Sequence, residues 1–410
     1  MERWKITLYT VWFSQILSIM SFNFGMPFIP FYIQQDLGVV QPDSIKIYTG
    51  LLSLAPAVTM AIMAPVWGIV ADRFGKKLML LRAMLCAAVI IGIMGLVTDV
   101  NQLLVLRFIQ GVFTGTVTAS SALVASAAPS NRLSYALGFM SSSTFIGASA
   151  GPVIGGFLAD LVGYRASFYA GGVLMLLDFI LVLSLVKEEK TGLPAARDER
   201  EESAAPPFSF LSLTMLSVLI MIVILRVSRS VFSPYLPLYV QELMAGSGGV
   251  VKLTGMINGV TGLATALAGL TLSRLGDRYD KMKLLRVFFI ASIAASILVP
   301  AVAGNLWLFT AAYGVFFFIM GGVEPVLISI SSEKTPAGRQ GVLFGVQGTV
   351  GNAGFAISPI IGGAISLGYS YTAILMLVPL TLVPGLVLLF FLKKGVGKTP
   401  KLSTDTSADA

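Results

Sequence analysis

The sequence contains no histidine and a single cysteine, Cys86, among its 410 residues. The lack of histidine excludes histidine-based catalytic triads and histidine metal sites, and one cysteine can form neither an internal disulfide nor a cysteine zinc cluster. Charged residues are also scarce, at 12% against about 25% in soluble domains. These absences predict that the chain is not an enzyme, that it holds no metal at a histidine or cysteine site, and that any proton transfer near neutral pH uses carboxylates.

Long apolar runs take the place of the missing charge. Hydrophobic residues make up 56% of the chain, and the mean hydropathy is +0.86. Backbone groups in lipid must be satisfied within their own segment, so each run of about 20 apolar residues is expected to be a helix. Twelve such spans lie near residues 6–31, 47–70, 78–97, 101–127, 134–160, 166–186, 211–240, 252–274, 284–303, 305–331, 341–366 and 370–392. The predicted class is an all-α, multi-pass membrane protein.

The positions of lysine and arginine predict how these spans are oriented. Only Lys46, Arg165 and Lys252 fall on one side of the membrane, three more arginines lie within spans, and the other 22 of the 28 fall on the opposite side. The positive-inside rule places that richer side in the cytoplasm, and both termini with it. The net charge of +8 therefore indicates membrane topology and not a nucleic-acid partner.

The chain also contains two similar halves. The segment from Pro27 to Gln34 matches the segment from Pro234 to Gln241, and Gly50 to Arg73 matches Gly255 to Arg278 at nearly the same offset. Six spans per half give both halves the same orientation, as in a parallel-repeat transporter with its site between two bundles. The polar, charged stretch at mid-chain is expected to tether the bundles. The predicted units are an N-terminal six-helix bundle at 1–186, a cytoplasmic linker at 187–210, a C-terminal six-helix bundle at 211–392 and a cytoplasmic tail at 393–410.

A glycine-rich, charged segment follows the second span. The stretch from Gly68 to Lys77 (GIVADRFGKK) resembles the cytoplasmic loop signature of the major facilitator superfamily, G-x-x-x-D-[RK]-x-G-[RK]-[RK]. A charge cluster of this kind can latch one bundle to the other and release it when the conformation changes; the alternative is a plain positive-inside anchor. In the second copy, Ser273 and Asp280 replace the two glycines. The candidate gating residues are Gly68, Asp72, Arg73, Gly75, Lys76, Asp277 and Arg278.

A second motif lies on the fifth span. The stretch from Gly147 to Gly156 (GASAGPVIGG) resembles the G-x-x-x-G-P-x-x-G-G element of drug/proton antiporters in the same superfamily. Glycines every four residues allow helices to approach closely, and proline is tolerated in a membrane helix. The candidate helix-packing residues are Gly147, Gly151, Pro152, Gly155 and Gly156.

Taken together, residues 6–392 resemble a twelve-span multidrug efflux transporter of the major facilitator superfamily. The resemblance implies two six-helix bundles related by a pseudo-two-fold axis, and proton-driven export of amphiphilic small molecules by alternating access. It also implies a monomer in a bacterial cell membrane, with protons as the coupling ion and no cofactor. Two alternatives stay open: an exporter of one anionic or zwitterionic metabolite, siderophore or lipid, and a receptor or channel, which the paired halves disfavour.

Ionisable groups within spans are the candidates for proton coupling, because each costs about 2.5–3.5 kcal/mol on insertion scales. Glu324 precedes Pro325 in span 10, and Asp178 lies in the middle of span 6. Arg107 begins an R-x-x-x-G element in span 4, which the resemblance associates with proton transfer. The alternatives are a static ion pair for Glu324, packing against a polar neighbour for Asp178, and an arginine that extends to the membrane surface for Arg107.

The candidate substrate cavity combines polar and aromatic residues of the spans that line it in the family. Arg226 and Arg229 lie three residues apart, hence on one helix face. They either pair with Glu324 or present a cationic surface to an anionic or zwitterionic amphiphile. For the aromatic residues, ordinary helix packing is the alternative. The predicted cavity residues are Phe22, Asn23, Phe113, Arg226, Arg229, Phe232, Tyr235, Tyr313 and Phe317.

Overall fold

The computed structural model describes residues 3–129, 132–186, 212–244, 248–272, 275, 279–335 and 340–391. Within these ranges the ordered elements are helices and no strand is present. Twelve helical segments are long and apolar enough to cross a membrane, which confirms the predicted class and span count. The predicted linker at 187–210 and the tail at 393–410 lie outside the described residues.

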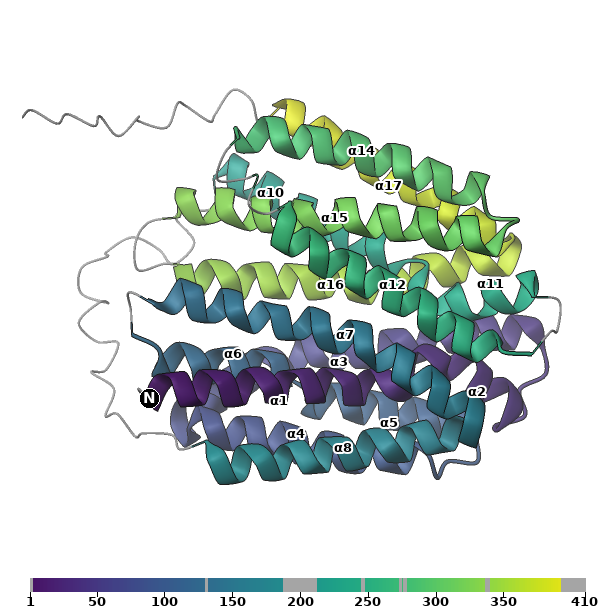
Figure 1. Cartoon of the computed structure of the whole chain (residues 1–410), viewed down its shortest axis with the longest axis horizontal. Coiled ribbons are helices and arrows are strands. Elements are labelled where there is room, and N and C mark those ends of the chain that lie inside the picture. The colour runs from purple at the N-terminus through teal and green to yellow at the C-terminus, as the bar shows by residue number, and fades with distance from the viewer. Residues whose placement is uncertain are drawn as a thin grey trace, which may run out of the picture.

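The N-terminal half forms one bundle, drawn from purple to teal in the lower part of Figure 1. Its elements are α1 (Arg3–Gly25), η1 (Met26–Phe28), α2 (Ile29–Gln35), α3 (Pro42–Phe74), α4 (Lys76–Met94), α5 (Val100–Phe113), α6 (Thr116–Ala127), α7 (Leu133–Val162) and α8 (Tyr164–Leu185). The C-terminal half forms the green-to-yellow bundle above it. Its elements are α10 (Leu213–Ser230), η3 (Ser233–Tyr235), α11 (Leu236–Leu243), α12 (Val250–Thr271), α14 (Lys281–Ala301), α15 (Leu306–Lys334), α16 (Gln340–Gly368) and α17 (Tyr371–Phe391).

Three spans predicted as continuous helices are interrupted. A 3₁₀ turn containing Pro27 separates α1 from α2, and the equivalent turn containing Pro234 separates α10 from α11. Proline has no backbone N–H, so it breaks the helical hydrogen-bond ladder at the same place in both halves. The fourth span breaks between α5 and α6 at Gly115, whose φ of +135° is a conformation that residues with a Cβ rarely adopt.

The packing repeats along with the sequence. In the N-terminal bundle α1 contacts α7 and α8, α3 contacts α5, and α4 contacts α8; in the C-terminal bundle α10 contacts α16 and α17, α12 contacts α15, and α14 contacts α17. Between the bundles, α7 packs on α12 and α16 packs on α3. The fifth span of each bundle therefore packs against the second span of the other bundle, as a pseudo-two-fold axis requires.

Equivalent residues make the equivalent contacts across this axis. A Cβ added to Gly255 would lie 2.5 Å from the carbonyl oxygen of Pro152, and one added to Gly50 would lie 3.4 Å from that of Pro359. At one end of the interface the amides of Gln34 and Gln241 exchange hydrogen bonds, at 3.4 and 3.2 Å between nitrogen and oxygen. These two glutamines hold the same place in their repeats, so their contact lies on the axis.

The glycine motif places α7 between its own bundle and the other. Added Cβ atoms at Gly147, Gly151 and Gly155 would all lie within 3 Å of α1 atoms, the closest at 2.3 Å from the carbonyl oxygen of Phe24. Gly156 instead faces the ring of Phe28 and the backbone of α12. Gly147, Gly151 and Gly155 therefore bring α7 close to α1, and Gly156 brings it close to α12 at the interface between the bundles.

Replacing Gly155 with alanine is expected to destabilise the folded protein by about 1–3 kcal/mol, because the new methyl group overlaps the backbone of α1. Thermal unfolding in detergent measures the effect. Gly138→Ala is the matched control on the same helix, since a Cβ there meets nothing within 4 Å. Equal stability of the two variants would show that the close approach of α1 and α7 does not depend on Gly155.

Candidate functional site

A cavity of about 320 Å³ lies between the two bundles. The N-terminal half contributes residues of α1, η1, α2, α3, α5 and α7 to its wall, and the C-terminal half contributes residues of α10, η3, α12 and α15. Four of the predicted proton-coupling and cavity residues line it: Asn23, Arg107, Arg229 and Phe317. Pro152 of the glycine motif lines it as well.

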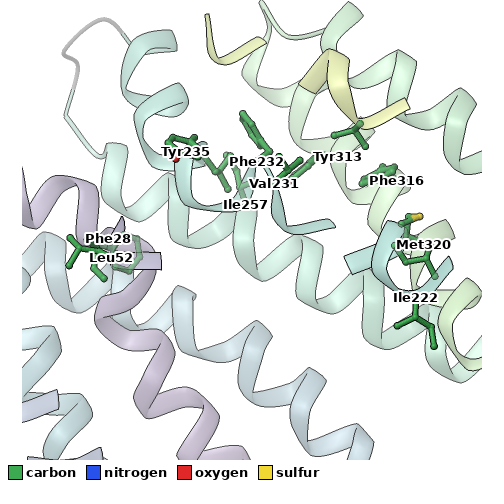
Figure 2. Packing of buried hydrophobic residues seen from close by; sticks show 14 of the residues in the cluster. Phe28, Leu52, Ile222, Val231, Phe232, Tyr235, Ile257, Tyr313, Phe316 and Met320 are labelled. Carbon is green, nitrogen blue, oxygen red and sulfur yellow. The ribbon is translucent and has the colours of Figure 1, made fainter. Parts of the chain in front are cut away.

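Six other predicted cavity residues lie away from this cavity. Phe232 and Tyr313 are buried inside the C-terminal bundle, with ring centroids 6.0 Å apart (Figure 2). Tyr235 is also buried, and its hydroxyl donates to the carbonyl of Pro359 on α16. Phe232 and Tyr313 therefore pack within their own half, as in the helix-packing alternative, whereas the Tyr235 hydroxyl also lies against Gly50 of α3 in the other bundle. The other three predicted cavity residues that do not line it are Phe22, Phe113 and Arg226.

An ionic cluster joins α10 to α15 behind the cavity wall. Glu324 accepts a hydrogen bond from Arg226, and its second oxygen lies 3.6 Å from a guanidinium nitrogen of Arg229. Arg229 also donates to the hydroxyl of Thr265 at 3.3 Å and lies over the ring of Phe317 at 5.5 Å. One carboxylate is therefore shared by two guanidinium groups, and the second of these reaches the cavity.

Arg107 turns into the bundle and does not extend to the membrane surface. Its Nε donates to the carbonyl of Leu52 on α3 at 2.7 Å, and its Nη1 donates to the Gln110 amide oxygen at 2.6 Å and contacts the Met26 sulfur at 2.9 Å. Four residues on, a Cβ at Gly111 would overlap α3. The R-x-x-x-G element thus seats α5 against α3 and positions the guanidinium in the cavity wall.

Asp178 occupies a different place from the other candidate proton carriers. Its side chain is completely buried between α8 and α1, where the Ser18 hydroxyl donates to the carboxylate at 2.7 Å. It does not line the cavity, and no ion pair reaches it within the part of the chain that the structure describes. The carboxyl group is therefore enclosed within the N-terminal bundle, away from the cavity and from the Glu324 cluster.

We therefore expect Asp178→Asn to retain proton-driven transport, since the side chain lies outside the cavity and the amide keeps its shape and an acceptor oxygen for Ser18. Transport into vesicles under a pH gradient is the measurement. Asp178→Leu serves as the contrast, because it removes the oxygen acceptor of the Ser18 hydroxyl and leaves it only the weak acceptor sulfur of Met175, which should lower stability by about 1–3 kcal/mol. Loss of the pH-driven component in Asp178→Asn, with normal folding, would assign proton coupling to this carboxylate.

Five of the seven predicted gating residues, Gly68, Asp72, Arg73, Gly75 and Lys76, lie on or beside the junction of α3 and α4. Gly75 joins the two helices with a φ of +100°, which explains the glycine at this position. Gly68 and Arg73 are exposed on the last turns of α3, and α4 begins at Lys76. Asp277 and Arg278 lie outside the described residues, and gating by this cluster stays a prediction.

Sequence reasoning missed the contribution of α12. Asn258, Thr261 and Thr265 line the cavity from this helix, whereas all the predicted cavity residues lie on spans 1, 4, 7 and 10. Polar residues spaced three, four and seven apart on an otherwise apolar span share one face. This spacing is the sequence signal that could have identified α12 as a helix lining the cavity.

Comparison with known proteins agrees with this architecture. A family model described as Major Facilitator Superfamily matches residues 11–251 and 218–408. The multidrug resistance protein MdtG of Proteus mirabilis is 31% identical over 379 residues, covering 90% of this chain and 92% of that protein. MdtG of Klebsiella pneumoniae is also 31% identical over 379 residues, covering 91% and 90% of the two chains.

A solved structure shares the fold. The human organic anion transporter MFSD10 (TETRAN) superposes with a TM-score of 0.70, covering 95% of this chain and all of that one, at 15% sequence identity. That likeness concerns the arrangement of helices alone. With two matched bundles, twelve membrane helices and relatives aligned over nine-tenths of its length, the chain belongs to the major facilitator superfamily and is a transporter, not an enzyme.

Proposed function

We propose that this chain exports amphiphilic small molecules from the cytoplasm in exchange for protons, by alternating access of its two bundles. The observation that carries the proposal is a cavity walled by both repeats next to a carboxylate, Glu324, held by two arginines. The name of its relatives, multidrug resistance protein, supports efflux of more than one compound. The positive-inside pattern supports cytoplasmic termini, and we propose a monomer without a cofactor.

Glu324 is the proposed proton acceptor. Ionised, it holds Arg226 and Arg229 of α10 to α15; protonated, it loses the charge that attracts both guanidiniums. The protein changes conformation either with substrate in the cavity or with Glu324 protonated. The substrate-loaded form carries substrate outward and the protonated form carries the proton inward, so the two are exchanged. A membrane potential supplies about 2.3 kcal/mol per charge per 100 mV, and each pH unit adds about 1.4 kcal/mol.

Transport by the purified chain in proteoliposomes tests the proposal. Two chemically unrelated amphiphilic dyes are expected to accumulate against their gradients when a pH gradient is imposed, and an ionophore that collapses the pH gradient is expected to stop both. A saturable flux of a single compound class would favour the specific metabolite exporter, which the two arginines in the cavity wall support. A flux that neither saturates nor responds to the ionophore would indicate a passive pore.

A further inference from the structure

The cavity wall carries two guanidinium groups, one from each bundle. Arg107 belongs to α5 and Arg229 to α10, and both line the same space of about 320 Å³. Among the described residues that line it, none is an aspartate or a glutamate. The charge facing a bound molecule is therefore positive.

Arg107 has only neutral partners in the described part of the chain. It donates to a backbone carbonyl and an amide oxygen and touches a thioether, and no carboxylate lies within ion-pair distance in the described ranges. A charged side chain at this depth is costly, and such residues in membrane transporters usually mark a substrate or ion pathway. An anionic group on a ligand would supply the missing counter-charge.

Arg229 is only partly neutralised. Glu324 is hydrogen-bonded to Arg226, and its distance to the Arg229 nitrogen is 3.6 Å. Arg226 and Arg229 share the carboxylate of Glu324, and Arg107 has none among the described residues. Together these four side chains carry two excess positive charges even when Glu324 is ionised. Protonation of Glu324 would raise that excess further.

We infer that the cavity binds its substrate through an anionic group, a carboxylate, sulfonate or phosphonate, held between Arg107 and Arg229. Guanidinium groups suit such oxyanions because their parallel N–H donors match two oxygens at once. Phe145 and Phe317 line the same cavity and offer an apolar surface for the rest of the molecule. The inference rests on the proposed function, of which it specifies the substrate class.

Two probes of matched shape and opposite fixed charge test this inference. They are naphthalene-1-sulfonate and (1-naphthylmethyl)trimethylammonium, with binding to the full chain in lipid nanodiscs measured by equilibrium dialysis. The sulfonate is expected to bind at least about tenfold more tightly than the ammonium. Arg107→Gln and Arg229→Gln should each weaken sulfonate binding by about tenfold, the loss of one charge-assisted interaction, without weakening ammonium binding.

Two further variants separate recognition from folding. Arg165→Gln removes a guanidinium of the same bundle that pairs with Asp36 away from the cavity, and it should leave sulfonate binding unchanged. Arg107→Lys keeps the charge and should retain more sulfonate binding than Arg107→Gln. Preference for the ammonium, equal binding of both probes, no detectable sulfonate binding, or unchanged binding in both glutamine variants would each overturn the inference. Proton-driven efflux of the dyes would still stand in those cases, because it is measured separately.

Discussion

Replacing Glu324 with glutamine is expected to abolish accumulation of substrate driven by a pH gradient. Glutamine keeps an acceptor oxygen for Arg226 but can neither bind nor release a proton, so it fixes α10 and α15 in the arrangement of the neutral side chain. Accumulation in proteoliposomes should fall to the level of vesicles without protein. Exchange of labelled for unlabelled substrate at equal pH should persist, because that reaction needs no net proton movement.

A sulfonate-binding measurement on Glu324→Gln distinguishes a loss of proton coupling from a loss of the substrate site. Removing the negative charge beside Arg229 should leave sulfonate binding intact or make it tighter. Glu242→Gln is the matched control, since Glu242 is exposed at the end of α11 and lies outside the cavity. If Glu324→Gln still accumulates substrate against its gradient, Glu324 is not the proton acceptor and the proposed coupling route is wrong.

The architecture was predictable because the signals for it are repeated along the chain. Twelve apolar runs and two copies of the same motifs predicted the spans and their duplication, and the paired contacts Gly50–Pro359 and Gly255–Pro152 show that duplication in the packing. Close approach of helices depends on small side chains at fixed spacing. A glycine pattern therefore indicates which helix faces meet.

The lining of the cavity was harder to predict because helices that are apolar on all sides carry little information about their rotation. Phe317 lines the cavity, whereas Tyr313, one turn earlier on α15, is buried behind it. Phe232 packs against Tyr239 and Phe309 of its own bundle. These orientations are set by neighbouring helices, which the local sequence does not encode.

Charged residues were the exception, because few positions inside a membrane protein can hold them. Arg229 was a candidate both for pairing with Glu324 and for facing the substrate, and the structure shows it near Glu324 and in the cavity wall. Arg107 was expected either in proton transfer or at the membrane surface, and its contacts with α3 and η1 exclude the surface position. Its role in proton transfer stays a prediction.

Joining Gln34 to Gln241 covalently is expected to stop transport completely. Their amides are hydrogen-bonded where α2 meets α11, and alternating access requires this end of the interface to separate in each cycle. In a Cys86→Ser background, the Gln34→Cys/Gln241→Cys protein would be treated with a short bis-methanethiosulfonate reagent. Transport should fall to background and return when a reductant cleaves the link.

A second cross-link at the same end shows whether the loss comes from tying the two bundles together. Asp36 and Arg165 form an ion pair of 3.1 Å between nitrogen and oxygen within the N-terminal bundle. The Asp36→Cys/Arg165→Cys protein, linked by the same reagent, should keep transporting because the end of α2 and the start of α8 belong to one bundle and move together. Full transport by the Gln34–Gln241 linked protein would mean that the bundles do not separate here, and alternating access at this end would have to be abandoned.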